Sequence, residues 1–173
     1  RQRLLDALSQ SWEAMLRYCQ EQDPILTVRD APDTGLEQCT LTALSHQAKR
    51  LPQRILPLST LQQGLYFHAR LSEARNTYVN QITLPIHGAD PARLADCWQQ
   101  LMRRHSVLRS TVSQIDGQAQ LMVWDSLEVH CEQVDGLKQP SFSLEAYKQG
   151  LVEQGFELEQ PLNQEPQPLW RLD

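Results

Sequence analysis

The sequence has no long apolar run, no excess of basic charge and no closely paired cysteines. None of its apolar runs approaches the roughly twenty residues that a helix needs to span a bilayer. Residues 1–22 are amphipathic and charged throughout, unlike a signal peptide. The net charge of −5 argues against a nucleic-acid or membrane-surface protein, because both need a basic face. We therefore expect a cytoplasmic protein with neither a nucleic-acid partner nor a membrane partner.

Reactive groups with a recognisable spacing are also missing. The four cysteines are far apart and form no C-x-x-C pair, which predicts reduced, mostly buried thiols of a cytosolic protein. The five histidines do not cluster with them, so no zinc site is expected. A glycine-rich phosphate loop, a G-x-S-x-G elbow and a metal-ligand pair are absent as well. The cysteines are Cys19, Cys39, Cys97 and Cys131.

What the sequence does contain is enough apolar material for one domain, or for a domain with an appendage. Forty per cent of its 173 residues are apolar, which is sufficient for a core. Apolar residues near the start recur at three- and four-residue spacing and predict an amphipathic helix that ends at Asp23-Pro24. These apolar residues are Leu4, Leu5, Leu8, Trp12, Met15, Leu16 and Cys19.

The chain is predicted to divide into three parts. Residues 24–52 are polar and broken by Pro24, Pro32, Gly35 and Pro52, which predicts a linker crossing a surface, with a short helical turn around 40–49. A structureless loop of this length is improbable inside one compact domain. We therefore expect residues 1–22 to belong to an earlier domain, residues 23–50 to form an interdomain linker and residues 51–173 to form a second domain.

Two helices are predicted in the first half of this second domain. Ser59 and Gln62 have the spacing of a capping box, and they precede a helix whose apolar residues cover most of its circumference, which predicts burial. Asp90-Pro91 begins a helix with one clean apolar face that ends at His105. Between the two helices, residues 78–85 alternate as a strand does.

The second half is predicted to contain strands and one more helix. Residues 108–115 and 118–124 predict two strands joined by a hairpin turn at Asp116-Gly117. A further strand is predicted at 127–134 and the first half of another at 169–173. Ser143 is expected to cap a helix that ends at Gly155.

The stretch Arg103 to Val112 is expected to carry the chain from a helix into a strand, with charged side chains at the joint. His105 is the best-placed histidine, but a catalytic base needs a partner, and none has a telling spacing. A packed, hydrogen-bonded histidine at a helix end is the favoured interpretation. Arg109 begins an apolar strand, where a structural ion pair is favoured over substrate binding.

The remaining polar candidates have ordinary explanations. His68 is expected to be packed on its helix and His87 to lie in a turn, while His46 and His130 show no signal. An acidic run is most simply a solvated face. It comprises Glu153, Glu157, Glu159 and Glu165. The residues by themselves therefore predict an α/β domain without an active site.

Two stretches together resemble a known family. Residues 56–68, L-P-L-S-T-L-Q-Q-G-L-Y-F-H, resemble the opening motif of a nonribosomal peptide synthetase condensation domain. Residues 104–112, R-H-S-V-L-R-S-T-V, are similar to its second motif, R-H-x-x-L-R-T. The resemblance covers about residues 51–173. The motif residues of interest are Ser59, Gln62, Gly64, Arg104, His105, Leu108 and Arg109.

The resemblance implies a fold and a reaction. The expected fold is an α/β, two-layer α+β sandwich: part of the N-terminal lobe of a chloramphenicol-acetyltransferase-like fold. The implied reaction joins a donor and an acceptor thioester, which are the substrates carried on phosphopantetheine arms of two peptidyl carrier proteins. No cofactor is expected to bind directly. Adjacent epimerization and adenylation domains are the other implied partners.

The family's catalytic motif, H-H-x-x-x-D-G, is absent from the 173 residues. The resemblance therefore implies no catalytic residue in this chain, a sequence truncated before that motif and an inactive polypeptide. It also implies that Arg109 would pair with the aspartate of the missing motif. The sequence is similar to the subtype that accepts a D-configured donor. The first fifty residues resemble the closing helix and linker of an epimerization or condensation domain.

Two rival hypotheses remain open. The first is a CoA-dependent acyltransferase of the same superfamily, against which the opening motif argues. The second is a non-catalytic docking or linker module, which the apolar stripe of the first helix favours for residues 1–50.

Overall fold

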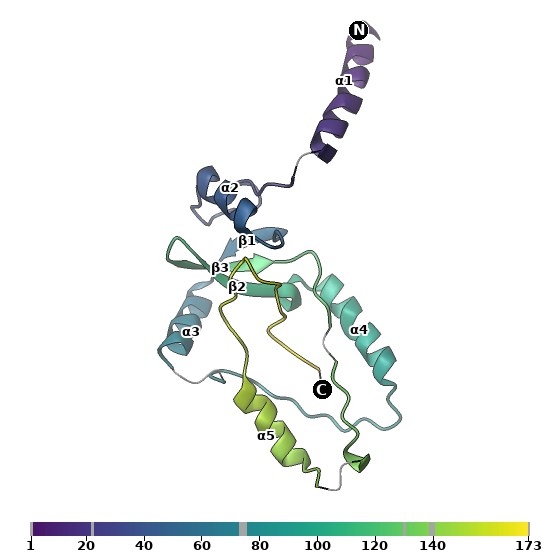
Figure 1. Cartoon of the computed structure of the whole chain (residues 1–173), viewed down its shortest axis with the longest axis vertical. Coiled ribbons are helices and arrows are strands. Elements are labelled where there is room, and N and C mark those ends of the chain that lie inside the picture. The colour runs from purple at the N-terminus through teal and green to yellow at the C-terminus, as the bar shows by residue number, and fades with distance from the viewer. Residues whose placement is uncertain (1, 22, 73–75, 130, 139–140, 173) are drawn as a thin grey trace.

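The computed structural model describes residues 2–21, 23–72, 76–129, 131–138 and 141–172. It combines helices with a small antiparallel sheet, as the predicted α/β class requires (Figure 1). In chain order the elements are α1 (Gln2–Glu21), α2 (Gln38–Gln47), β1 (Arg54–Pro57), α3 (Thr60–Leu71), α4 (Pro91–Arg104), the 3-10 helix η1 (Ser106–Arg109), β2 (Ser110–Ile115), β3 (Gln118–Val123), the 3-10 helix η2 (Gly136–Lys138) and α5 (Leu144–Gln154).

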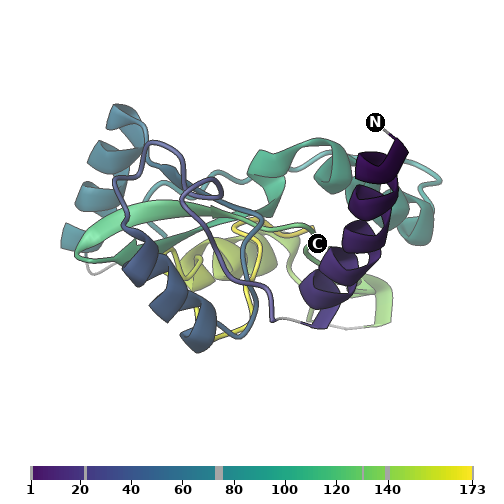
Figure 2. The same ribbon diagram turned by 90° about the horizontal axis from the view of Figure 1, so that it is seen from above.

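The sheet has the order β1-β3-β2, and both pairings are antiparallel. The β2–β3 hairpin turns at Asp116 and Gly117, whose φ angles are 49° and 78°. Positive φ at both central residues is the signature of a type I′ turn, so the predicted hairpin is confirmed. Seen from above, the hairpin extends between α2 and α3 (Figure 2).

The core lies against this sheet and includes residues from the segment expected to be a linker. Leu26, Ala31 and Leu41 are buried together with Ile55 and other residues of the second domain. The expected helical turn is present as α2. Part of the segment is therefore packed against the core, because Leu26, Ala31 and Leu41 find cover there, whereas Ile25 and Val28 stay exposed. The other core residues are Met102, Ile115, Met122, Trp124 and Leu127.

Helix α1 stands away from the other elements (Figure 1). Its apolar side chains at Trp12, Met15 and Leu16 are exposed. Within the described ranges, no helix is both long and apolar enough to cross a bilayer.

The capped helices form as predicted, but the burial predicted for α3 is wrong. Helices α4 and α5 begin at the predicted caps, Asp90 and Ser143. Along α3, Leu61, Phe67 and Leu71 remain about two-thirds or more exposed, at 73%, 65% and 68%. Apolar residues around a whole circumference need cover on several sides, and none of the residues of α3 is buried.

Three predicted strands are also wrong. Residues 78–85 belong to no strand, and Ile82 and Leu84 are exposed. The predicted strands at 127–134 and 169–173 are reduced, among the described residues, to one bridge between Cys131 and Leu172. Alternation specifies which face a side chain occupies, whereas a strand also needs a hydrogen-bonded neighbour.

The first predicted strand begins two residues late, because Leu108 and Arg109 belong to η1. The prediction of mostly buried thiols is also wrong. Cys19, Cys39 and Cys97 are exposed and Cys131 is half-buried, because each lies on the outer side of its element or in a loop.

Candidate functional site

The two motif stretches line one cavity of about 970 Å³. Leu58, Gln62 and Leu65 line it from the first stretch, and Val107 and Leu108 line it from the second. Residues 77–84, helix α5 and residues 169–172 form further parts of the wall. Cavities of this size are typical of small-molecule sites. The sequence placed the two stretches more than forty residues apart, and the antiparallel sheet brings them to the same space.

In the first stretch, Ser59 and Gln62 form the predicted capping box. The Ser59 hydroxyl accepts from the Gln62 amide at 3.3 Å, and the Gln62 side-chain oxygen accepts from the Ser59 amide at 2.8 Å. Two free amides at the start of α3 are satisfied in this way. A Cβ at Gly64 would meet open space, so the fold of the described residues places no steric demand for glycine there. The box fixes where α3 begins beside the cavity.

In the second stretch, α4 ends at Arg104 and His105 is its C-cap. Arg104 and His105 are both exposed. The His105 side chain has no hydrogen bond or ion pair within the part of the chain that the structure describes. The predicted packed, hydrogen-bonded histidine is therefore wrong, because the apolar face of α4 stops one turn earlier, at Met102. Among the described residues, His105 therefore also lacks the hydrogen-bonded partner that a catalytic base needs.

Leu108 is held at the cavity wall by a tryptophan. The indole nitrogen of Trp170 donates to the Leu108 carbonyl at 2.7 Å. Trp170 in turn stacks on Trp98 of α4 with ring centroids 5.1 Å apart. Both rings are half-buried, and their stacking adds to the stability of the contact. The arrangement connects α4, η1 and the end of the described chain.

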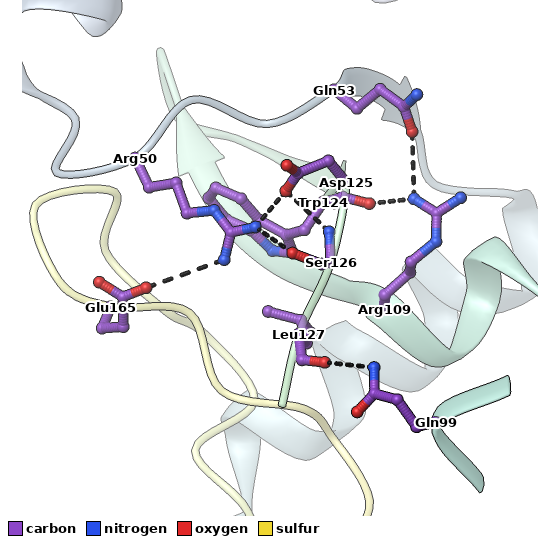
Figure 3. A network of polar contacts seen from close by, with 9 residues as sticks. All are labelled: Arg50, Gln53, Gln99, Arg109, Trp124, Asp125, Ser126, Leu127 and Glu165. Carbon is purple, nitrogen blue, oxygen red and sulfur yellow. Dashed lines mark hydrogen bonds and ion pairs between the residues drawn. The ribbon is translucent and has the colours of Figure 1, made fainter. Parts of the chain in front are cut away.

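Arg109 is held by neutral oxygens and not by a carboxylate (Figure 3). Its Nη1 donates to the Gln53 side-chain oxygen at 3.1 Å and to the Trp124 carbonyl. Its Nε is buried and has no partner among the described residues. The structural ion pair favoured from the sequence is therefore absent from the described residues. Asp125, the carboxylate that directly follows Trp124 in the chain, is bound by Arg50 instead.

The Arg50 guanidinium forms a polar cluster that the sequence did not reveal. It donates to Asp125 and to the Ser126 hydroxyl, the latter at 2.9 Å, and lies 3.8 Å from Glu165 (Figure 3). Partial burial raises the pKa of Asp125, but hydrogen bonds from Arg50 and the Ser126 amide outweigh it and hold that pKa below its ordinary value. The partners are 75 residues apart in sequence, so no local spacing indicates them.

A second cluster surrounds Tyr66, which also lines the cavity. Its hydroxyl lies 2.7 Å from a Glu159 oxygen and accepts from Gln114 at 3.1 Å. Arg70 lies 3.9 Å from Glu159. Burial raises the pKa of Tyr66, and the hydrogen bond to the Glu159 carboxylate raises it further. The cluster joins α3, β2 and the segment after α5.

The acidic run and the other histidines differ partly from expectation. Glu159 and Glu165 form ion pairs, Glu159 with Arg70 and Glu165 with Lys49 at 3.4 Å, although their side chains stay 38% and 49% exposed. His68 is exposed, although its Nδ1 lies 2.9 Å from the Tyr78 hydroxyl. His46 and His87 are also exposed, with His87 in the predicted turn, and His130 lies outside the described residues. No cluster of three or more potential metal ligands occurs in the described ranges.

Comparison with known proteins supports the same two stretches. The model of the condensation-domain family matches residues 52–172. A linear gramicidin synthase of Brevibacillus parabrevis is 28% identical over 169 residues, which cover 88% of the chain and 3% of that protein. Bacitracin synthase 3 of Bacillus licheniformis is 29% identical over 111 residues, which cover 63% and 2%. CymA of Salinispora arenicola, a probable non-canonical nonribosomal peptide synthetase, is 36% identical over 98 residues, which cover 56% and 1%. The chain thus spans only a few per cent of the length of these relatives.

Proposed function

Since the chain belongs to the condensation-domain family, we propose that it forms one wall of a site that joins carrier-bound building blocks in a nonribosomal peptide synthetase. In the proposed reaction, the acceptor amine attacks the carbonyl carbon of the donor thioester. A C–N bond forms, the C–S bond breaks, and the donor's phosphopantetheine sulfur leaves as a thiol after taking up the amine proton. The substrates would be the thioesters of two peptidyl carrier proteins.

The observation that carries this proposal is the shared cavity. Both motif stretches line it, through residues such as Leu65 and Leu108. Its wall combines apolar side chains with many polar ones, including the charged Arg70, Lys148 and Glu159, so a long arm would find both apolar contacts and hydrogen-bonding groups there. Positioning two tethered reactants is itself a large source of rate enhancement. We therefore assign these residues a positioning role and no proton transfer.

The finer parts of the proposal concern the neighbours of the chain. We propose that α1 is the closing helix of a preceding epimerization or condensation domain and that an adenylation domain is a further partner. The exposed Trp12, Met15 and Leu16 support contact between α1 and such a domain. The opening motif supports a D-configured donor, and we further propose a cytoplasmic synthetase.

The test uses the synthetase that contains this chain, with both carrier proteins loaded and the carrier-bound product followed by mass spectrometry. Leu65→Arg places a charge in the cavity wall, and we expect it to lower the rate of amide formation by about tenfold or more, a cost of about 1.4 kcal/mol. Leu61→Arg is the matched control, because Leu61 lies on the same helix, is 73% exposed and does not line the cavity. Both variants should keep the helical circular dichroism of the unaltered protein.

Other outcomes would overturn the proposal. Equal rates of amide formation for the two variants would show that the cavity plays no part in the reaction. Acyl transfer from CoA thioesters in preference to carrier thioesters would favour the acyltransferase hypothesis. Carrier binding without amide formation would favour a docking module.

We also propose that the 173-residue polypeptide alone is silent, because it lacks the H-H-x-x-x-D-G motif. The same mass-spectrometric assay should detect no carrier-bound amide above the level without protein. Amide formation by the polypeptide alone would contradict this proposal.

A further inference from the structure

We infer that residues 24–53 form a brace, fixed to the sheet and belonging to the same folded unit as residues 54–172. This inference does not depend on the proposed reaction. It replaces the expected linker at 23–50 with a structural part of the domain. Two kinds of contact carry it, one apolar and one polar, and they lie at separate places along the segment.

The apolar contacts anchor the first part of the brace. Leu26 is 4% exposed and Leu41 is 0% exposed, and both belong to the core cluster that contains Ile55 and Met122. Burying one leucine side chain contributes about 1.5–3 kcal/mol. Few surface linkers bury leucines this completely. The brace therefore contributes to the free energy of folding, and the core would lose this contribution without it.

Backbone groups of the brace are also satisfied, as a packed segment requires. The Ile55 amide donates to the Asp30 carbonyl at 2.7 Å, which connects β1 to the brace. Inside the brace, the Leu26 amide donates to the Ser45 hydroxyl and the Gln38 side chain donates to the Leu26 carbonyl, both at 2.8 Å. These bonds hold α2 against the chain that precedes it.

The polar contacts anchor the last part of the brace. Arg50 binds Asp125 and Ser126 just after β3, and its guanidinium also lies near Glu165 (Figure 3). The Lys49 amide donates to the Leu162 carbonyl at 2.9 Å. The Gln53 amide donates to the Val123 carbonyl at 2.7 Å. Exposed ion pairs contribute only about 0–1 kcal/mol each. We therefore assign the energy to the buried leucines and the alignment of the segment to Arg50.

The match to the linear gramicidin synthase is independent support. This match covers 88% of the chain, so only about 21 residues of the chain are unmatched. The match to the family model begins at residue 52, so the longer match must include at least about thirty of the residues before it. Most of the brace therefore has a counterpart in that protein. A freely varying tether would not be expected to align in this way.

Hydrogen exchange of the full 173-residue chain tests the inference without any truncation. The reporter amides are those of Leu26, Lys49 and Gln53, because each donates to a defined acceptor. We expect them to exchange at least about a hundredfold more slowly than the unstructured rate, as amides in a packed unit do. Exchange of all three at the unstructured rate would show a tether and overturn the inference.

A pair of arginine variants tests the alignment role. Arg50→Ala should speed exchange at Lys49 and Gln53 by about tenfold or more, equivalent to about 1.4 kcal/mol of local stability, while leaving the β2–β3 amides unchanged. Arg54→Ala is the matched control, because Arg54 lies four residues away with an exposed side chain. Equal effects of the two substitutions on exchange would show that Arg50 does not position the brace. If Arg50→Ala unfolds the chain while Arg54→Ala does not, Arg50 supplies global stability, and the assignment of the energy to the buried leucines is overturned.

Discussion

Replacing Thr111 with valine tests the buried hydrogen bond that holds Trp124 beside the second motif stretch. The Trp124 indole nitrogen donates to the Thr111 hydroxyl at 2.9 Å, and the two residues are 2% and 0% exposed. Valine has nearly the same shape as threonine but no acceptor. The indole N–H would then be buried without a partner, because indole can only donate.

The magnitude follows from the burial of both groups. An unsatisfied buried donor costs about 1–3 kcal/mol. With a urea dependence of about 2 kcal/mol per M, the unfolding midpoint should fall by about 0.5–1.5 M. Circular dichroism in urea measures that midpoint. The indole N–H resonance of Trp124 in a proton–nitrogen correlation spectrum should shift in Thr111→Val and stay near its place in Thr111→Ser.

Thr83→Val is the matched control, because Thr83 is exposed and lies outside the sheet. Surface substitutions of this kind change stability by about 0.5 kcal/mol or less. A Thr111→Val midpoint equal to that of the unaltered protein, with an unmoved indole resonance, would refute the reasoning. It would mean that the hydrogen bond contributes nothing to the fold.

Three further predictions concern local features. Ser59→Ala removes the acceptor in the capping box with Gln62 and should destabilise the fold by about 0.5–2 kcal/mol, measured by urea unfolding; no change would contradict the box. Gly117→Ala forces a side chain into a turn with φ of 78° and should cost about 1–2 kcal/mol in the same assay, unless the turn is of another type. The pKa of Asp125 is lowered in the fold, so its pairing with Arg50 stabilises above the ordinary value of 3.8, and that stabilisation is lost as the pH falls below it. Asp125→Asn should therefore lower the urea midpoint at pH 6 and have a diminishing effect toward pH 3, and a pH-independent difference would count against the pairing.

Features set by neighbouring residues were predictable from the sequence. Ser59 and Gln62 are three residues apart, and the capping box needs only that spacing. Asp116 and Gly117 specify their turn through the backbone conformations they tolerate. The caps at Asp90 and Ser143 follow the same logic. The place of the second motif at a helix-to-strand joint was also predictable, because the apolar period changes there.

Features set by distant residues were not predictable in this way. Arg50 and Asp125 are 75 residues apart, and no sequence pattern near either residue indicates that they pair. The apolar periodicity of α3 shows that several of its faces could be buried, but it does not show how many have a neighbour. The segment around Leu41 is polar on average, so its average composition concealed a fully buried leucine. Composition measures a whole segment, whereas packing depends on single positions.

The strand order has a consequence for how the molecule assembles. Strands β2 and β3 meet through a two-residue turn, which requires little loop closure, whereas β1 must cross about sixty residues to reach β3. We expect the hairpin to form first and to act as the nucleus onto which the earlier strand and the brace condense. During synthesis on the ribosome, the side chains of Leu41 and Ile55 would therefore stay exposed to solvent until residue 123 has emerged. In the nascent chain, residues 24–57 thus keep their core leucines exposed for longer than the hairpin does.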